Sequence, residues 1–125
     1  MPTSVLLSIR PKFADAILEG TKTFELRRAL FRSPAVRRIV IYASSPISRV
    51  VGEFSLDGIL ELEPKKLWAV TCKGAGVDRE SFDNYFRGCE RGFALRIARP
   101  RRYARPLSLG DHCGLSRPPQ SFCYL

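Results

Sequence analysis

Short apolar segments with strand character recur along this chain, and residues that favour turns separate them. The strand patterns cover residues 5–9, 23–28, 36–43, 49–56 and 92–98. Residues 58–62 are expected to extend or continue the fourth of these strands after a kink, and the apolar C-terminal end is expected to dock as a last strand. The helical patterns cover residues 11–19, 64–70 and 78–87. This order is not the regular strand–helix alternation of a parallel sheet. We therefore predict an α+β fold: a small, closed or half-closed barrel of five to six mostly antiparallel strands with two to three inserted helices.

The length of 125 residues suits one domain, and the sequence contains no repeat and no linker long enough to divide it, so we expect a single domain over 1–125. Hydrophobic residues make up 45% of the chain, a globular value. No apolar run approaches the roughly 18 residues that a membrane span needs. The N-terminal apolar run is too short for a signal peptide, so we expect a cytoplasmic protein with no membrane partner.

Charge is the most unusual feature of the composition. Lys and Arg number 21 against 12 Asp and Glu, which gives a formal net charge of +9, and 16 of the cations are Arg. The planar guanidinium binds phosphate and stacks on bases, so a basic domain of this kind is typical of polyanion binding, with nucleic acid as the commonest partner. A GC-rich genome would also enrich Arg, and composition alone leaves both explanations open.

The four cysteines do not form a metal-binding pattern. Cys72, Cys89, Cys113 and Cys123 include no C-x-x-C pair, and His112 has only one cysteine beside it. We expect four reduced thiols, no metal site and no cofactor.

Residues 20–28 concentrate the polar residues with the strongest functional pattern. Phe24 and Leu26 fall on one face of an extended strand, and Thr23, Glu25 and Arg27 fall on the other. Gly20 ends the preceding helix and places Lys22 at the start of this strand. A polar face of this kind either meets solvent or lines a pocket. The pocket hypothesis gives these candidate ligand-binding residues: Lys22, Thr23, Glu25 and Arg27, with Tyr42, Ser44 and Ser45 at the end of a neighbouring strand.

The same residues carry a family resemblance. Gly20-x-Lys22-x-x-Glu25-x-Arg27 matches the G-x-K-x-x-E-x-R signature of ASCH domains, which belong to the PUA-like superfamily. Further segments, including Ile41-Tyr42-Ala43-Ser44-Ser45-Pro46 and Gly92-Phe93-Ala94, resemble the stand-alone prokaryotic branch described as predicted transcriptional regulators. The resemblance implies a PUA-like β-barrel, a cleft beside the signature and a link to RNA or modified nucleotides.

Three hypotheses for this site remain open. In the first, the domain binds nucleic acid, RNA above all, or a modified nucleotide in a basic cleft, with a regulatory role as one option. The cations proposed to contact phosphates in this case are Arg10, Lys12, Arg28, Arg37, Arg38, Arg101 and Arg102. In the second, the protein is a hydrolase of RNA phosphodiesters or of acylated cytidine-type nucleosides, with Lys22 and Glu25 as catalytic residues. In the third, Glu25 forms only a structural ion pair with Lys22 or Arg27 at a strand edge.

The resemblance bears unevenly on the hydrolase hypothesis. Some ASCH proteins resemble amidohydrolases that use a Lys, a Thr and a Glu, and others resemble ribonucleases. Lys22 stands where the family has its lysine, but Glu25 stands where the amidohydrolases have their reactive threonine. This departure removes the expected hydroxyl and weakens the amidohydrolase version.

Overall fold

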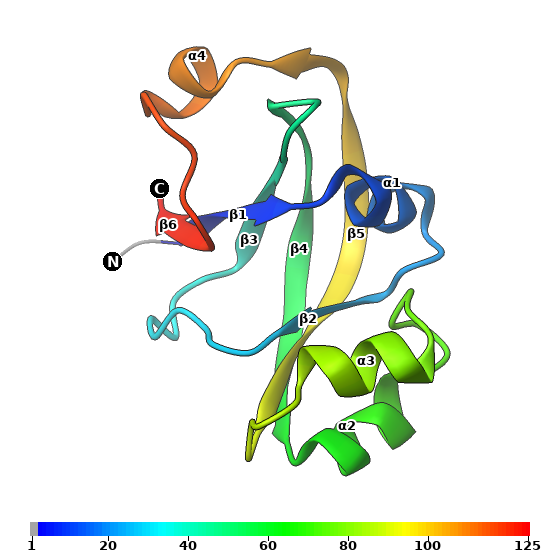
Figure 1. The fold of residues 1–125 in the computed structure, drawn as a ribbon. Coiled ribbons are helices and arrows are strands. Elements are labelled where there is room, and N and C mark those ends of the chain that lie inside the picture. Colours follow the sequence, from blue (N-terminus) through cyan, green and yellow to red (C-terminus); the bar gives the residue numbers. More distant parts are fainter. Residues whose placement is uncertain (1–2) are drawn as a thin grey trace.

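The computed structural model describes residues 3–125, which form one curled six-stranded sheet and four helices (Figure 1). The strands are β1 (Ser4–Ile9), β2 (Phe24–Arg27), β3 (Arg38–Ala43), β4 (Arg49–Leu62), β5 (Gly92–Leu107) and β6 (Phe122–Tyr124). The helices are α1 (Pro11–Glu19), α2 (Pro64–Thr71), α3 (Arg79–Tyr85) and α4 (Leu109–Cys113).

The sheet order is β2-β5-β4-β3-β1-β6, and β1–β3 is its one parallel pair among the described strands. The other four pairs are antiparallel, and the sheet curls into a half-barrel. The predicted α+β class and the mostly antiparallel strands are confirmed. The fourth helix, α4, has only five residues and had no clear helical pattern.

The first helix forms as its end residues predict. Pro11 occupies the first turn, where a missing N–H costs nothing. Gly20 ends the helix in the left-handed conformation (φ 90°), and its N–H caps the carbonyl of Ile17. The chain then continues through residues 21–23 into β2.

The longest strand, β5, runs through a segment that contains two prolines. The two prolines predict that residues 99–106 cannot form a central strand throughout. These residues are in strand conformation, but only β4 pairs with them, because β2 ends its pairing with β5 at Arg96. Proline is tolerated on such an edge, and the register shifts around Arg99, whose φ is +48°. Gly52 lies opposite, where an added Cβ would approach the Arg101 carbonyl oxygen to 2.5 Å.

Three apolar clusters form the core, and the two faces of β3 separate two of them. Ile39 and Ile41 pack in the cluster beneath α1, whereas Val40 and Tyr42 pack in the cluster that includes Leu109 of α4. The third cluster lies between α2, α3 and the β2–β5 end of the sheet. Figure 1 shows α2 and α3 together at one end of the molecule and α4 at the other, with α1 between them. None of the helices within residues 3–125 combines the length and hydropathy of a membrane span.

Candidate functional site

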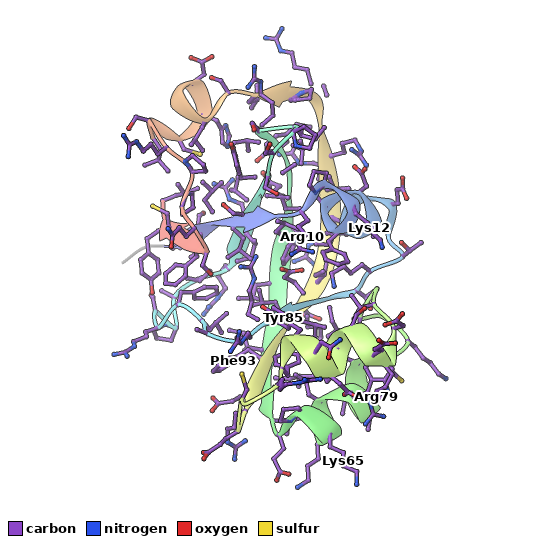
Figure 2. The ribbon with its side chains drawn as sticks, in the orientation of Figure 1. Arg10, Lys12, Lys65, Arg79, Tyr85 and Phe93 are labelled. Carbon is purple, nitrogen blue, oxygen red and sulfur yellow. The ribbon has the colours of Figure 1, made fainter. Side chains whose placement is uncertain are left out.

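A cavity of about 260 Å³ opens between α1, β2 and α3. Figure 2 shows Arg10 and Lys12 on one side of this region and Tyr85 on the other. The cavity is lined by Ser8, Ile9, Arg10, Phe13, Lys22, Glu25, Leu26, Arg27, Val77 and Tyr85. Three of the predicted ligand-binding residues, Lys22, Glu25 and Arg27, therefore meet at one cavity.

Lys22 is a buried lysine with 2% of its surface exposed. Its ammonium donates a hydrogen bond to the carbonyl of Ala75, lies 3.8 Å from Glu25 Oε1 and sits 5.1 Å from the centre of the Phe13 ring. Burial lowers the pKa of Lys22 below its ordinary value, and the nearby Glu25 carboxylate only partly opposes this shift. The result is a cation at the cavity wall whose proton is easier to remove than that of a solvated lysine.

Glu25 and Arg27 form a second, tighter ion pair on the same face of β2. They are two residues apart on a strand, so their side chains project in the same direction. Arg27 places Nε and Nη2 each 3.1 Å from Glu25 Oε2, and Nη2 also donates to the Ser8 carbonyl at 3.0 Å. Glu25 is only 6% exposed. The ion pairs expected by the structural hypothesis are present, but they lie in the cavity wall and not at an exposed edge.

Tyr85 provides an aromatic ring and a hydroxyl at the cavity. The residue is 41% exposed, and its hydroxyl donates to the Leu26 carbonyl at 3.4 Å. Burial of the hydroxyl raises the pKa of Tyr85, so the group stays protonated at neutral pH. The helical spacing that Tyr85 shares with Phe82 and Phe86 predicts a core residue, so the sequence pattern alone does not identify it as a cavity residue.

The loop between α2 and α3 holds Lys22 in place. The Gly74 carbonyl accepts hydrogen bonds from the backbone N–H groups of Thr23 (2.8 Å) and Phe24 (3.1 Å), which ties the loop to the start of β2. An added Cβ at Gly76 would come within 3.0 Å of the Lys22 side chain. From the sequence, the glycines of residues 73–76 predict only a flexible break, since no local pattern reveals which carbonyl a distant lysine will contact.

The remaining predicted ligand-binding residues lie away from the cavity. Tyr42 is buried in the apolar cluster that contains Val40 and Leu109, because strand alternation places it on the same face of β3 as Val40. Ser44 and Ser45 form the turn that joins β3 to β4. Thr23 is exposed to solvent, with its hydroxyl directed toward Gly74.

The cations proposed to contact phosphates are scattered over the surface. Arg10 lines the cavity and Lys12 follows it on α1. Arg28 donates to the Cys89 thiol at 3.4 Å, close to Tyr85. The others lie elsewhere, where Arg37 bonds to the Pro34 carbonyl, Arg38 and Arg101 pair with Glu53, and Arg102 pairs with Asp15.

Metal-ligating groups do not converge at this site. In the part of the chain that the structure describes, no three His, Cys, Asp or Glu side chains are close enough to hold a metal ion. What the described residues bring together is a buried Lys–Glu–Arg network, a tyrosine and an exposed arginine around one small cavity.

Comparison with known proteins agrees with this fold and signature. The ASCH domain family model matches residues 7–101, and the chain belongs to this family. A curated relative, the ASCH domain-containing ribonuclease of Zymomonas mobilis, is 32% identical over 123 residues, covering 96% of this chain and 82% of the relative.

Solved structures extend this similarity to three dimensions. The crystal structure of ASCH from Zymomonas mobilis superposes with a TM-score of 0.90 at 31% identity, over 98% of this chain and 87% of that one. The N-terminal domain of Staphylothermus marinus McrB shares the fold more distantly, with a TM-score of 0.55 at 17% identity over 89% of this chain and 79% of that one.

Proposed function

We propose that this protein binds single-stranded RNA and holds one unpaired nucleotide in the cavity beside Lys22, Glu25 and Arg27. The observation that carries the proposal is the cavity itself, with its buried ionic wall and with Arg10 and Tyr85 around it. Membership of the ASCH family and the relative named as a ribonuclease support an RNA-related role.

The size of the cavity favours a single nucleotide over a duplex. Its volume of about 260 Å³ lies near the lower limit of ligand pockets, which start at about 300 Å³. A base that has left its stack fits such a space, whereas paired bases in a duplex cannot enter it. Tyr85 offers a partly exposed ring for stacking, and Arg10 offers a guanidinium for the adjoining phosphate.

The binding proposal is tested with two arginine variants that remove the same charge. Arg10→Ala changes a residue of the cavity, and Arg105→Ala changes an exposed residue of β5 outside it. We expect Arg10→Ala to weaken binding of a labelled single-stranded RNA about tenfold, and Arg105→Ala to change it far less. Fluorescence anisotropy measures both, with the same sequence as duplex RNA as a control. Equal losses in the two variants would show that binding follows net charge and not the cavity.

A second candidate function is cleavage of RNA phosphodiesters at this site. The lowered pKa of Lys22 makes it suited to accept a proton, and the Tyr85 hydroxyl, which is protonated at neutral pH, lies at the same cavity as the candidate proton donor. Removal of a proton from the ribose 2′-OH would start attack on the adjacent phosphorus, and protonation of the leaving oxygen would complete the cleavage. DNA lacks that hydroxyl.

Cleavage is tested by incubating the protein with RNA and with DNA of the same sequence and separating the products by size. We expect RNA to be cut and DNA to stay intact, and Tyr85→Phe to slow cleavage about 100-fold while RNA affinity stays within a few-fold. Cleavage of DNA at the same rate, or full activity of Tyr85→Phe, would argue against this chemistry. Acylated nucleosides serve as comparison substrates, because Thr23 lies against Gly74 and leaves the cavity without a threonine hydroxyl.

A further inference from the structure

Two cysteines outside the cavity lie on the same side of the sheet. Cys123 of β6 pairs directly with Leu6 of β1, and residues directly opposite on antiparallel strands project to the same face. Cys113, at the end of α4, packs against the apolar cluster that contains Leu6 and Leu109. Both thiols are free and half-buried. Cys113 therefore packs on this cluster, and Cys123 lies on the face of the sheet that carries it.

The electrostatics of the two thiols agree with this placement. Burial raises the pKa of Cys113, and the nearby Cys123 raises it further. The raised pKa keeps the Cys113 sulfur mainly as the thiol at neutral pH, which makes it less nucleophilic, because the thiolate is the reactive form.

The segment between the two cysteines supports the wall of the cavity. Its Ser121 hydroxyl accepts a hydrogen bond from Arg27 Nη1 at 3.3 Å, and its Ser121 carbonyl accepts one from the Ser8 N–H at 3.1 Å. The Pro119 carbonyl accepts a further bond from the Ser8 hydroxyl at 2.6 Å. Ser8 and Arg27 both line the cavity. A constraint on residues 114–122 is therefore a constraint on the cavity.

We propose that Cys113 and Cys123 are a redox-sensitive pair that forms a reversible disulfide and fixes residues 114–122 against the cavity. The oxidant is a peroxide. The Cys123 thiolate attacks one oxygen of hydrogen peroxide, which breaks the O–O bond, gives a sulfenic acid at Cys123 and releases hydroxide, which a proton converts to water. The Cys113 sulfur then attacks the Cys123 sulfur, forms the S–S bond and releases a second water as its own proton leaves. A thiol reductant reverses the reaction.

The pairing is tested on the full chain by treating the reduced protein with hydrogen peroxide, blocking the remaining thiols and digesting with trypsin. Arg105 and Arg117 each precede proline and resist trypsin, so one peptide, 103–125, contains Cys113 and Cys123 and no other cysteine. We expect this peptide to lose the mass of two hydrogen atoms and to escape alkylation. Cys72 and Cys89 should remain alkylated. Alkylation of both cysteines in 103–125, or their linkage to Cys72, Cys89 or a second chain, would overturn the proposal.

Variants separate the pair from the other cysteines. Cys123→Ala and Cys113→Ala should each prevent the mass loss, and the matched control Cys72→Ala should keep it. The wild-type peptide map decides the question even where a variant at Cys113 fails to fold. Oxidation should also raise the unfolding midpoint of wild type by several degrees, since closing this short loop restricts the unfolded chain, and a reductant should reverse the shift.

The link to the cavity rests on the proposed RNA binding and has its own readout. A disulfide that fixes Ser121 beside Arg27 preorganises the cavity wall, so oxidised wild type should bind the single-stranded RNA several-fold more tightly than reduced wild type. Equal affinity of the two forms would overturn the proposal that the disulfide affects RNA binding at the cavity, but it would not count against the disulfide itself. Absence of RNA binding in both forms would instead count against the proposed function, and the peptide map would still decide the pairing.

Discussion

At the scale of single residues, the cavity depends on a charged group that the fold buries. Lys22 is as buried as the core leucines around it, yet it lines a cavity and contacts both a carboxylate and a carbonyl. Burying an ammonium costs several kcal/mol unless partners compensate it. Glu25 is that partner, and it also neutralises Arg27. Substitutions in the Lys22–Glu25–Arg27 network should therefore change the free energy of unfolding measurably.

The lowered pKa of Lys22 predicts how stability changes with pH. The unfolded chain holds the lysine proton up to about pH 10.5, whereas the folded protein releases it at a lower pH. Between these two values the unfolded state binds more protons, so stability rises with pH there, and the penalty of burial is largest below the folded pKa. Denaturant unfolding from pH 7 to 10.5 should show wild type gaining stability relative to Lys22→Met. If the difference in stability between wild type and Lys22→Met does not change with pH, the lowered pKa of Lys22 is contradicted.

Glu25→Gln should destabilise the protein by about 3 kcal/mol, because it leaves the buried Lys22 and the half-buried Arg27 without a compensating charge. Urea unfolding at neutral pH measures the change. Asp83→Asn is the matched control, since it breaks one exposed ion pair with Arg79 and should cost about 0.5 kcal/mol or less. If Glu25→Gln and Asp83→Asn lower the free energy of unfolding equally, the network contributes no more to stability than a surface ion pair.

At the scale of elements, the loop between α2 and α3 is fastened to β2 by close packing at Gly74. A Cβ at this position would lie 1.9 Å from Thr23 Oγ1, far inside any real contact. The loop and the strand therefore approach each other only because residue 74 is glycine. The contact places the neighbouring Ala75 carbonyl over Lys22.

Gly74→Ala should push the loop away from β2 and cost about 1–3 kcal/mol, with loss of RNA affinity as the Ala75 carbonyl leaves Lys22. Thermal unfolding and anisotropy measure the two effects. Adding Thr23→Ala removes the Oγ1 clash and should restore part of the stability. Gly110→Ala is the control, because only the Leu115 carbonyl lies near its Cβ, at 3.9 Å, and it should be nearly neutral.

At the scale of the whole molecule, a net charge of +9 is not gathered on one face. Several of the arginines pair with carboxylates away from the cavity, as Arg101 does with Glu53 of β4 and Arg102 with Asp15 of α1. Besides Lys22 and Arg27, which pair with Glu25, the cations near the cavity are Arg10 in its lining, Lys12 on α1 and Arg28 near Tyr85. The protein should therefore make few contacts to the phosphates of RNA bound at the cavity, fewer than its net charge of +9 suggests.

Affinity for single-stranded RNA should fall with salt, with a slope of log K against log salt of about −1.5 to −2, since each phosphate contact to a single strand contributes about −0.7. Titrations between about 50 and 200 mM salt measure the slope. Arg10→Ala should make it shallower by about one contact. A much steeper slope would show that the dispersed arginines, and not the cavity, carry the binding.

Much of the fold and part of the site follow from local sequence pattern. Pro11 and Gly20 bracket α1 because each residue satisfies a backbone requirement of a helix end. Alternation puts Glu25 and Arg27 on one face of β2 for the same local reason, and the glycine turn places Lys22 beside them. These features need only neighbouring residues, so the sequence alone determines them.

The rest of the site depends on contacts between distant parts of the chain. Lys22 meets the Ala75 carbonyl 53 residues away, and Arg27 meets Ser121 94 residues away. Periodicity reports which face of an element is apolar but not which element packs against it, so Tyr85 was assigned to the core and Tyr42 to the site. The sequence by itself determined the strand, its ionic face and the family. Only the tertiary structure decided which carbonyls, hydroxyls and aromatic ring complete the cavity. The pairing of β1 with β6 and of β2 with β5, together with the docking of α3, brings these groups there.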